Sequence, residues 1–300
     1  MSGLPNLLTN AVKSIFGHPV ALERVQNKHG DISVDLTPEQ NASANCVIRW
    51  EELGMGAHPH GRGQGWVLGW SMQGGVWQSY DYHSANLESL MVQDSSDDWT
   101  CDIRLVEGLS ASKSELKDFL TLDQMAEGTC QGLIEEVSPD GLEKNLAWSE
   151  IRIVNQKNTT DHFRHYAWDR RIHLINDGGS HHFAAARYLA GKLNMPVPLT
   201  GRLKEYNLSY KHVQGLREEF DMYPIKDCQV LFGEMMDALR SYEAGFCLMD
   251  LPSPFINNKV FMLPKNSSRS VAASKFLAQA GLPELGAHLA ELCDKQEFVL

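Results

Sequence analysis

Hydrophobic and polar residues alternate in the first third of the chain in the manner of β-strands. Apolar side chains occupy every second position from Trp66 to Met72, and Gly74-Gly75 follows at once. Two adjacent glycines permit the positive φ angles of a tight turn, so Val76 to His83 can return as a second strand. Alternation resumes at Trp99 to Leu105 after the polar run Asp94 to Asp98, which we interpret as a loop. The pattern predicts a β-hairpin and a third strand.

The central region mixes helical and strand-like spacing. Apolar residues between positions 114 and 134 repeat at helical intervals, with Ser114 as a candidate N-cap. Short segments with strand-like spacing lie at 150–154, 162–168 and 171–175. An alanine-rich helix is predicted directly after Gly178-Gly179. We predict an edge strand at Met195 to Leu199, because neither of its prolines can donate to a central ladder.

From Tyr210 onward helical spacing dominates. The predicted helices cover residues 213–220, 230–244, 271–280 and 285–293. The whole pattern predicts an α+β protein of three consecutive regions. These are a β-rich N-terminal module (1–108), a central core with its preceding helices (109–209) and a helical C-terminal region (210–300).

Composition narrows the class of protein. The chain has 300 residues, of which 43% are hydrophobic and 22% charged, which is ordinary for a globular protein. It has no apolar run near the ~20 residues that a membrane span needs and no recognisable secretory signal. Its six cysteines are scattered without a CxxC pair, so we expect reduced thiols, no thiolate metal site and a cytoplasmic location.

Charge is distributed unevenly along the chain. The net charge of −11 disfavours a protein that coats nucleic acid. Residues 151–220, however, hold eleven Lys/Arg against six Asp/Glu, which leaves a balance of −16 for the rest of the chain. Six of the twelve histidines also lie in this segment. We therefore look there for a site that binds a small anion.

The segment contains a corner between a strand and a helix. Asp177-Gly178-Gly179-Ser180-His181-His182 joins the strand at 171–175 to the alanine-rich helix. Free backbone N–H groups and the positive end of the helix dipole meet at such a corner, which is how many proteins bind phosphate. The two histidines can add donors, so we expect anion binding to strengthen as pH falls from about 7.5 to 6. The same pattern also turns a strand into a helix without any ligand.

The run DGGSHHFAAARYL, preceded by RIHLIN and followed by MPVPL, resembles the signature of the ParB/sulfiredoxin-like superfamily. The resemblance extends from Trp148 to Arg202 and implies a corner that binds nucleotide phosphates. Carried over to this chain, it assigns the phosphate contacts to Gly178, Gly179 and Ser180 and the motif histidine to His181. Members use the corner for ATP-dependent phosphoryl transfer, CTP-gated DNA clamping or nucleic-acid cleavage.

Two departures from that signature matter. Ser180 stands where sulfiredoxins have their reactive cysteine, so sulfinic acid reduction is not expected. His182 replaces the usual arginine, a permanent cation, so phosphate binding would need compensation from Arg170, Arg171 or Arg187. The proline-arginine box of chromosome-partitioning members is absent, which argues against a DNA clamp.

The resulting hypothesis is a protein that binds a phosphate-bearing ligand, a nucleotide first, with Mg²⁺ as a possible companion. If it is an enzyme, we expect a phosphotransferase or a nucleotide hydrolase, with His181 and the carboxylate of Asp177 as catalytic residues. The alternative for Asp177 is a turn residue that bonds to its own backbone. The alternative functions are a non-catalytic binding or inhibitor protein and a nuclease.

Other motifs carry less weight. His58-Pro59-His60 and His162-x-x-His165 lack a third ligand at metal-site spacing, so we predict no metal site. Trp66, Trp70 and Trp77 are expected on the core face of the hairpin. No Walker, Rossmann or Gly-x-Ser-x-Gly motif is present.

Overall fold

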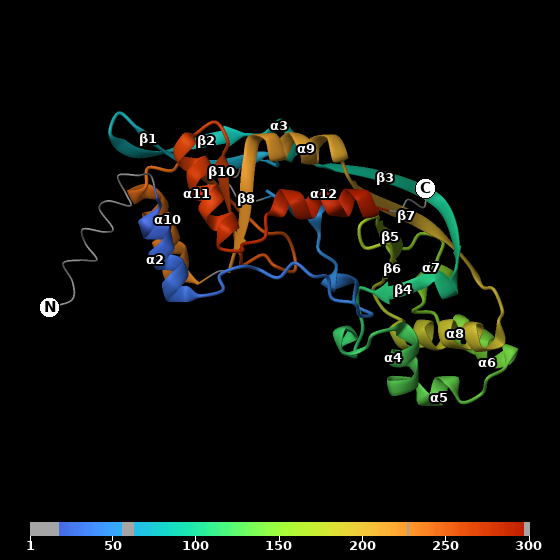
Figure 1. Cartoon of the computed structure of the whole chain (residues 1–300). Coiled ribbons are helices and arrows are strands. Elements are labelled where there is room, and N and C mark those ends of the chain that lie inside the picture. The colour runs from blue at the N-terminus through green and yellow to red at the C-terminus, as the bar shows by residue number, and fades with distance from the viewer. Residues whose placement is uncertain (1–17, 56–62, 227, 297–300) are drawn as a thin grey trace. The chain divides into compact units, whose positions relative to one another are not determined.

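The computed structural model in Figure 1 describes residues 18–55, 63–226 and 228–296. Contacts group the chain into two compact units, and each unit draws on separated segments. Unit 1 takes the described parts of 1–36, 49–90 and 209–294, and unit 2 takes 37–48, 91–208 and the two described residues after 294. The sequence analysis predicted three regions that follow one another along the chain. Each of the two observed units instead combines stretches that are separated in the sequence.

Unit 1 is built on an antiparallel sheet of five strands in the order β2-β1-β9-β10-β8. The strands are β1 (Trp66–Gln73), β2 (Val76–His83), β8 (Phe220–Ile225), β9 (Phe246–Asp250) and β10 (Lys259–Pro264). The predicted hairpin is confirmed, since Gln73 pairs with Val76 and both Gly74 and Gly75 have positive φ. Trp70 and Trp77 pack against the core as expected, whereas Trp66 packs beside His83.

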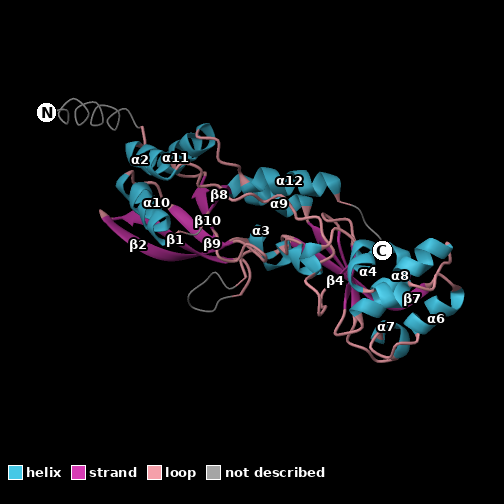
Figure 2. Cartoon of the chain, turned by 90° about the horizontal axis from the view of Figure 1, so that it is seen from below, coloured by secondary structure: helices cyan, strands magenta, loops and turns pink. Residues whose placement is uncertain are grey.

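Helices of unit 1 cover its sheet. They are α2 (Val20–His29), α3 (Ala85–Glu88), α9 (Tyr210–Glu219), α10 (Gln229–Ser241), α11 (Ser268–Gln279) and α12 (Leu285–Lys295). Side chains of α2, α10 and α11 form one apolar cluster with Phe246 and Phe261 of the sheet, and Figure 2 shows these helices together. The four helices predicted after Tyr210 are confirmed. The three strands between them were not predicted, because their side chains are mostly apolar and buried and so do not alternate with polar ones.

Unit 2 has a mixed sheet in the order β3-β7-β5-β6-β4. The strands are β3 (Met91–Asp102), β4 (Val106–Leu109), β5 (His162–Tyr166), β6 (Ile172–Ile175) and β7 (Pro198–Leu208). Its helices are α4 (Leu122–Thr129), α5 (Gln131–Ile134), α6 (Pro139–Leu146), α7 (Arg152–Asn155) and α8 (Ser180–Leu193). The predicted alanine-rich helix is confirmed as α8, whose buried Phe183, Ala186 and Ala190 lie in the apolar cluster of this unit.

Three local predictions in unit 2 were wrong. The polar run 94–98 belongs to β3, because an exposed strand keeps its backbone hydrogen bonds while polar side chains face water. The segment 150–154 is not a strand: its last three residues lie in the short helix α7, with Ile151 as the N-cap, since burial of Ile151 and Ile153 fits one helical turn as well as a strand. β7 is an interior strand, and Pro198 stands only at its first position, where the missing donor is tolerated.

The helical stretch at 114–134 is divided. A 3₁₀ turn (Leu116–Asp118) precedes α4, and α4 is capped by the side chain of Thr121 rather than by Ser114. The hydroxyl of Ser114 instead contacts His181. Ser114 is therefore part of the surroundings of the strand-to-helix corner.

The architecture confirms the predicted α+β class, with two sheets and helices in both units. No helix in the described part of the chain has the length and apolar composition that crossing a bilayer requires. All six cysteines are described, and none forms a disulfide.

Candidate functional site

The corner between β6 and α8 is built on two glycines with positive φ. Gly178 has a φ of 140° and Gly179, the N-cap of α8, a φ of 68°. A Cβ on Gly179 would lie 2.6 Å from the carbonyl carbon and oxygen of Glu150. Only glycine fits at position 179, because the backbone has a positive φ there and the chain at Glu150 leaves no room for a side chain. Because glycine has no side chain, nothing from the N-cap residue itself covers the first N–H groups of the helix.

Asn176 ties a second segment to this corner. Its Oδ1 accepts hydrogen bonds from the N–H groups of Ser110 and Ala111 at 3.1 Å each. Its Nδ2 donates to the carbonyls of Ala111 and Gly178 at 2.9 Å each. The buried amide thereby holds the segment after β4 against the corner.

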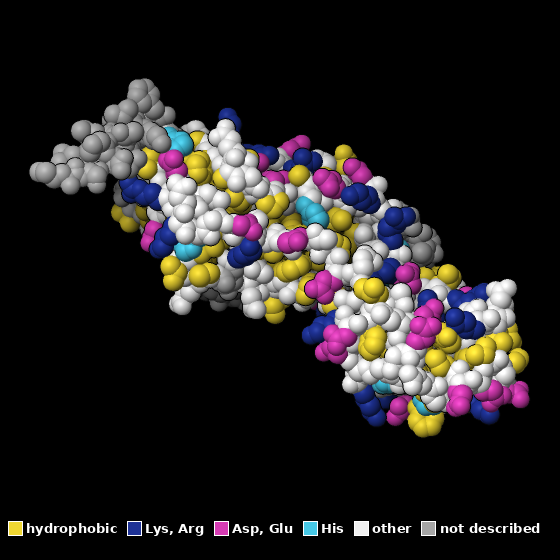
Figure 3. Space-filling view, turned by 60° about the horizontal axis from the view of Figure 1, so that its bottom comes forward, with side chains coloured by type: hydrophobic (Ala, Val, Ile, Leu, Met, Phe, Trp, Pro, Cys, Tyr) yellow, Lys and Arg dark blue, Asp and Glu magenta, His cyan; other side chains and the backbone are white. Residues whose placement is uncertain are grey.

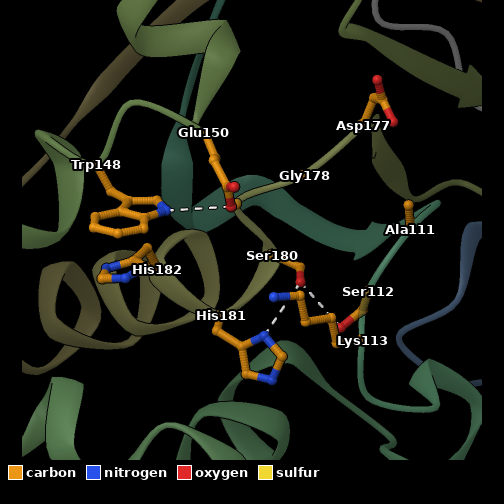
Figure 4. Close-up of a pocket in the computed structure, with 11 residues that line it drawn as sticks. Ala111, Ser112, Lys113, Trp148, Glu150, Asp177, Gly178, Ser180, His181 and His182 are labelled. Atoms are coloured by element: carbon orange, nitrogen blue, oxygen red, sulfur yellow. Dashed lines mark hydrogen bonds between the residues drawn. The ribbon is translucent and has the colours of Figure 1, made fainter.

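A pocket of about 400 Å³ opens at the corner (Figure 4). Its lining includes all six residues of the predicted run from Asp177 to His182. Five further lining residues were not predicted, namely Ala111, Ser112, Lys113, Trp148 and Glu150. They come from segments distant in sequence, so local spacing carried no signal for them.

Hydroxyl groups and His181 form a hydrogen-bonded network on one side of the pocket. The buried hydroxyl of Ser180 donates to Ser112 Oγ at 3.0 Å. His181 contacts Ser114 Oγ through Nε2 at 2.9 Å and Ser180 Oγ through Nδ1 at 3.4 Å. Both ring nitrogens of His181 thus have partners within the protein. This arrangement orients the imidazole beside the first turn of α8.

His182 lies on the other side, between Trp148 and Asn145. Its ring stacks on the indole of Trp148, with centroids 4.3 Å apart and planes 13° from parallel. Its Nδ1 is 3.0 Å from Asn145 Oδ1. Burial lowers the pKa of His182 below its ordinary value near 6.5; the nearby Glu150 carboxylate opposes this and His181 adds to it. The lowered pKa favours the neutral form of His182 at pH 7.

The pocket carries both signs of charge. Lys113 is exposed, and no described residue forms an ion pair with it. The carboxylate of Glu150 accepts a 3.3 Å hydrogen bond from Trp148 Nε1. Glu150 Oε2 would be 4.0 Å from a Cβ on Gly178, so a negative group already lies close to the glycines. Figure 4 shows this carboxylate beside Gly178.

Asp177 lines the pocket at its outer edge. Its carboxylate is 79% exposed and forms a 2.6 Å ion pair with Arg152 Nη1. Its backbone N–H donates to Asp161 Oδ1 at 3.1 Å. In Figure 4 the Asp177 side chain lies on the far side of Gly178 from Ser180 and His181. Its role as a base stays a prediction.

None of the three predicted arginines is among the residues that line the pocket. The guanidinium of Arg171 is buried, where it pairs with Asp169 at 2.8 Å and donates to the carbonyl of Asn41. Arg187 pairs with Asp123 and donates to two backbone carbonyls. Arg170 is exposed in the turn between β5 and β6, with a φ of 68°. The positive charge at the pocket comes instead from Lys113.

His162 and His165, the histidine motif that lies in the described part of the chain, are engaged with other side chains and the backbone. His165 is buried against Glu205 at 2.8 Å, and His162 bonds to the carbonyl of Thr160 and to Arg164. Within the described residues no group of three metal-ligating side chains occurs. His58-Pro59-His60 lies outside the described residues.

The fold and the pocket together define a two-sheet α+β protein with a strand-to-helix corner that could accept a small ligand. Residues 96–300 match the family of unknown function DUF6685, and since this is more than half of the chain, the protein belongs to that family. No curated protein and no solved structure matches the chain. The matched region contains every residue that lines the pocket.

Proposed function

We propose that the pocket at Gly178 to His182 binds a phosphate-bearing ligand, with a nucleotide as the first candidate. The proposal rests on three features that meet at one corner. They are two pocket-lining glycines with positive φ, a helix start without a side-chain cap, and the cation of Lys113, which forms no ion pair with a described residue. Backbone N–H groups at a helix start and a nearby ammonium group are the usual means of holding a phosphate.

Trp148 favours a nucleotide over a simpler phosphate. One face of the indole stacks on His182, and the residue is 45% exposed. Aromatic side chains with a free face commonly stack on nucleobases. A phosphate group at the glycines would place an attached nucleoside within the same pocket, toward Trp148.

The carboxylates of Glu150 and Asp177 favour a ligand that binds together with a cation. A phosphate and two carboxylates repel one another in a small pocket unless a cation lies between them. Mg²⁺ suits this role, because it usually binds one or two carboxylates together with substrate phosphates and water. We therefore propose that the ligand enters as its Mg²⁺ complex, with phosphotransfer or hydrolysis as the reaction to be tested.

Thermal denaturation with ATP, CTP, GTP and NAD, each with and without Mg²⁺, tests this proposal. A ligand at a hundred times its dissociation constant adds about 2.7 kcal/mol of stability, so at least one should raise the melting temperature. Lys113→Ala should reduce that rise. Lys117→Ala is the matched control, because Lys117 is an exposed lysine four residues away that does not line the pocket. No rise with any ligand, or equal rises in both variants, would contradict the proposal.

A second candidate function is a binding or inhibitor protein without catalysis. The position of Glu150 favours it, because the carboxylate beside Gly178 could stand in for an external anion at the start of α8. In that case Glu150→Gln should create binding of inorganic phosphate that the wild-type protein lacks. If Glu150 instead holds Mg²⁺, the same variant should weaken binding of the Mg²⁺–nucleotide.

The wider context also remains a proposal. The ParB/sulfiredoxin-like relationship and the cytoplasmic location stay predictions, and so does the expectation that the net charge disfavours a nucleic-acid partner. Basic and acidic side chains are interspersed on the face that Figure 3 displays, which supports a small ligand over a nucleic-acid strand. The nuclease hypothesis is not favoured by His165 and His173 of the basic segment, because both rings are buried in contacts with carboxylates of the protein itself.

A further inference from the structure

The side chain of Asn145 fixes which nitrogen of His182 carries a hydrogen. Asn145 is 4% exposed, and its Nδ2 donates to the carbonyls of Leu133 and Gly141 at 2.9 Å each. Both amide hydrogens are therefore used, and Oδ1 is the atom that faces His182 Nδ1 at 3.0 Å. An oxygen can only accept there, so Nδ1 must donate. In the neutral ring this leaves Nε2 with its lone pair.

The ring is also held in place. Trp148 stacks on it, and Nε2 has no hydrogen-bond partner among the described residues. The charged and titratable groups that line the same pocket are Lys113, Glu150, Asp177 and His181. Those of a second cavity that His182 also lines are Glu135, Glu136 and Lys144. An oriented, neutral imidazole with a free Nε2 at a ligand pocket is the arrangement that general-base catalysis uses.

The alternative bases in the pocket are already engaged. Asp177 is paired with Arg152, and His181 contacts a hydroxyl through each ring nitrogen. The pocket carboxylates of Asp177 and Glu150 each have one neighbour, Arg152 and Trp148 respectively. Of the two histidines, His182 is the one whose accepting nitrogen has no partner among the described residues. This differs from the sequence-based assignment of catalysis to Asp177 and His181.

Building on the proposed nucleotide site, we propose that His182 is the general base of a nucleotide hydrolase, with Asn145 as its positioning residue. A water oxygen bonds to the terminal phosphorus while the bond from phosphorus to the bridging oxygen breaks. The electron pair of that bond leaves on the nucleoside diphosphate. The proton lost by the water passes to His182 Nε2 and then to solvent. For ATP the products are ADP and inorganic phosphate.

His182→Asn is the most informative variant. The shorter amide can still donate to Asn145 from about the position of Nδ1, but it has no group at the position of Nε2. With ATP, CTP and GTP and Mg²⁺ as probes, phosphate release should fall by about 10²–10⁴-fold, while the nucleotide-induced rise in melting temperature persists. His182→Ala should regain part of its turnover in added imidazole. Unchanged phosphate release in His182→Asn would overturn the proposal.

A matched control lies outside the pocket. His212 contacts Asn86 Oδ1 through Nδ1 at 3.2 Å, which repeats the His182–Asn145 contact in unit 1. His212→Asn should leave phosphate release unchanged. An equal loss of turnover in this control would mean that the effect is not specific to the pocket, which would also overturn the assignment.

The tautomer itself can be measured without a ligand. In ¹⁵N-histidine NMR spectra at pH 7.5, His182 should show a protonated Nδ1 and an unprotonated Nε2, with the signal assigned by its loss in His182→Asn. An Nε2–H tautomer would overturn the proposal whatever the protein binds. If a nucleotide raises the melting temperature but the wild-type protein releases no phosphate, the general-base proposal fails and the binding function stands. If no nucleotide binds, both fail.

Discussion

Two groups of charged and histidine side chains lie within fourteen residues of sequence and behave in opposite ways. At one, the buried carboxylate of Asp169 accepts hydrogen bonds from Arg171 and from His173, at 2.8 Å to each. At the other, the Gly178–His182 corner opens into a pocket with Lys113 and Glu150. Both contain the residue types of a functional site, but the first satisfies its charges internally. Burial and pairing, rather than residue type, separate a structural cluster from a candidate site.

The largest expected effect comes from breaking the buried cluster. Asp169→Ala would leave the guanidinium of Arg171 and the ring of His173 buried without their carboxylate, so the free energy of unfolding should fall by about 3–5 kcal/mol. Asp177→Ala is the comparison at the pocket, where the exposed carboxylate should contribute little. Urea denaturation of both variants measures the difference. If the two variants lost similar amounts of unfolding free energy, the distinction between the buried cluster and the pocket would be wrong.

The glycines of α8 give the next largest effect. Gly179→Ala would force a side chain into positive φ and against the backbone of Glu150, which should cost about 1–3 kcal/mol. Gly191 lies within the same helix with open space around it. Gly191→Ala should instead stabilise the protein by up to about 1 kcal/mol, through helix propensity. Thermal denaturation of the pair checks both signs, and destabilisation by Gly191→Ala would contradict the helix geometry.

The two groups should also titrate in different pH ranges. Burial lowers the pKa of His182, so the unfolded chain takes up its proton first and stability falls as pH drops through about 6.5. For Asp169, burial raises the pKa, but hydrogen bonds from His173 and Arg171 hold it below the ordinary value of 3.8. Its contribution is therefore present above that value and lost below it. Denaturation from pH 7.5 to 3 should show a flatter profile near pH 6.5 in His182→Asn than in the wild type.

The smallest effect concerns anion affinity. A bound phosphate favours protonation of a histidine that contacts it, so inorganic phosphate and ATP should bind more tightly at pH 6 than at pH 7.5. The gain is limited because the pKa of His182 is lowered in the free protein. Calorimetric titration at the two pH values measures it. Equal affinities would indicate that neither histidine contacts the anion.

The sequence could predict the parts of the site that are local. The strand at Ile172–Ile175, the two glycines and α8 are consecutive, so their spacing and turn chemistry were sufficient. Lys113, Trp148 and Glu150 could not be predicted, because they reach the pocket only through tertiary contacts such as those of Asn176.

The three arginines illustrate the reverse case. Their position in a basic segment made them candidates for phosphate contacts. The nearby carboxylates of Asp169 and Asp123 and several backbone carbonyls satisfy Arg171 and Arg187. The net charge of a segment counts only residues that are close in sequence. Whether an arginine is available to a ligand depends on the carboxylates and carbonyls that the fold places beside it.

A structure of the protein with the nucleotide that most raises its melting temperature tests the central claim most directly. The account predicts phosphates against the backbone of Gly178 to His181 and within reach of Lys113, with the base over the free face of Trp148. A nucleotide bound elsewhere, with the Glu150 carboxylate still beside Gly178, would contradict it.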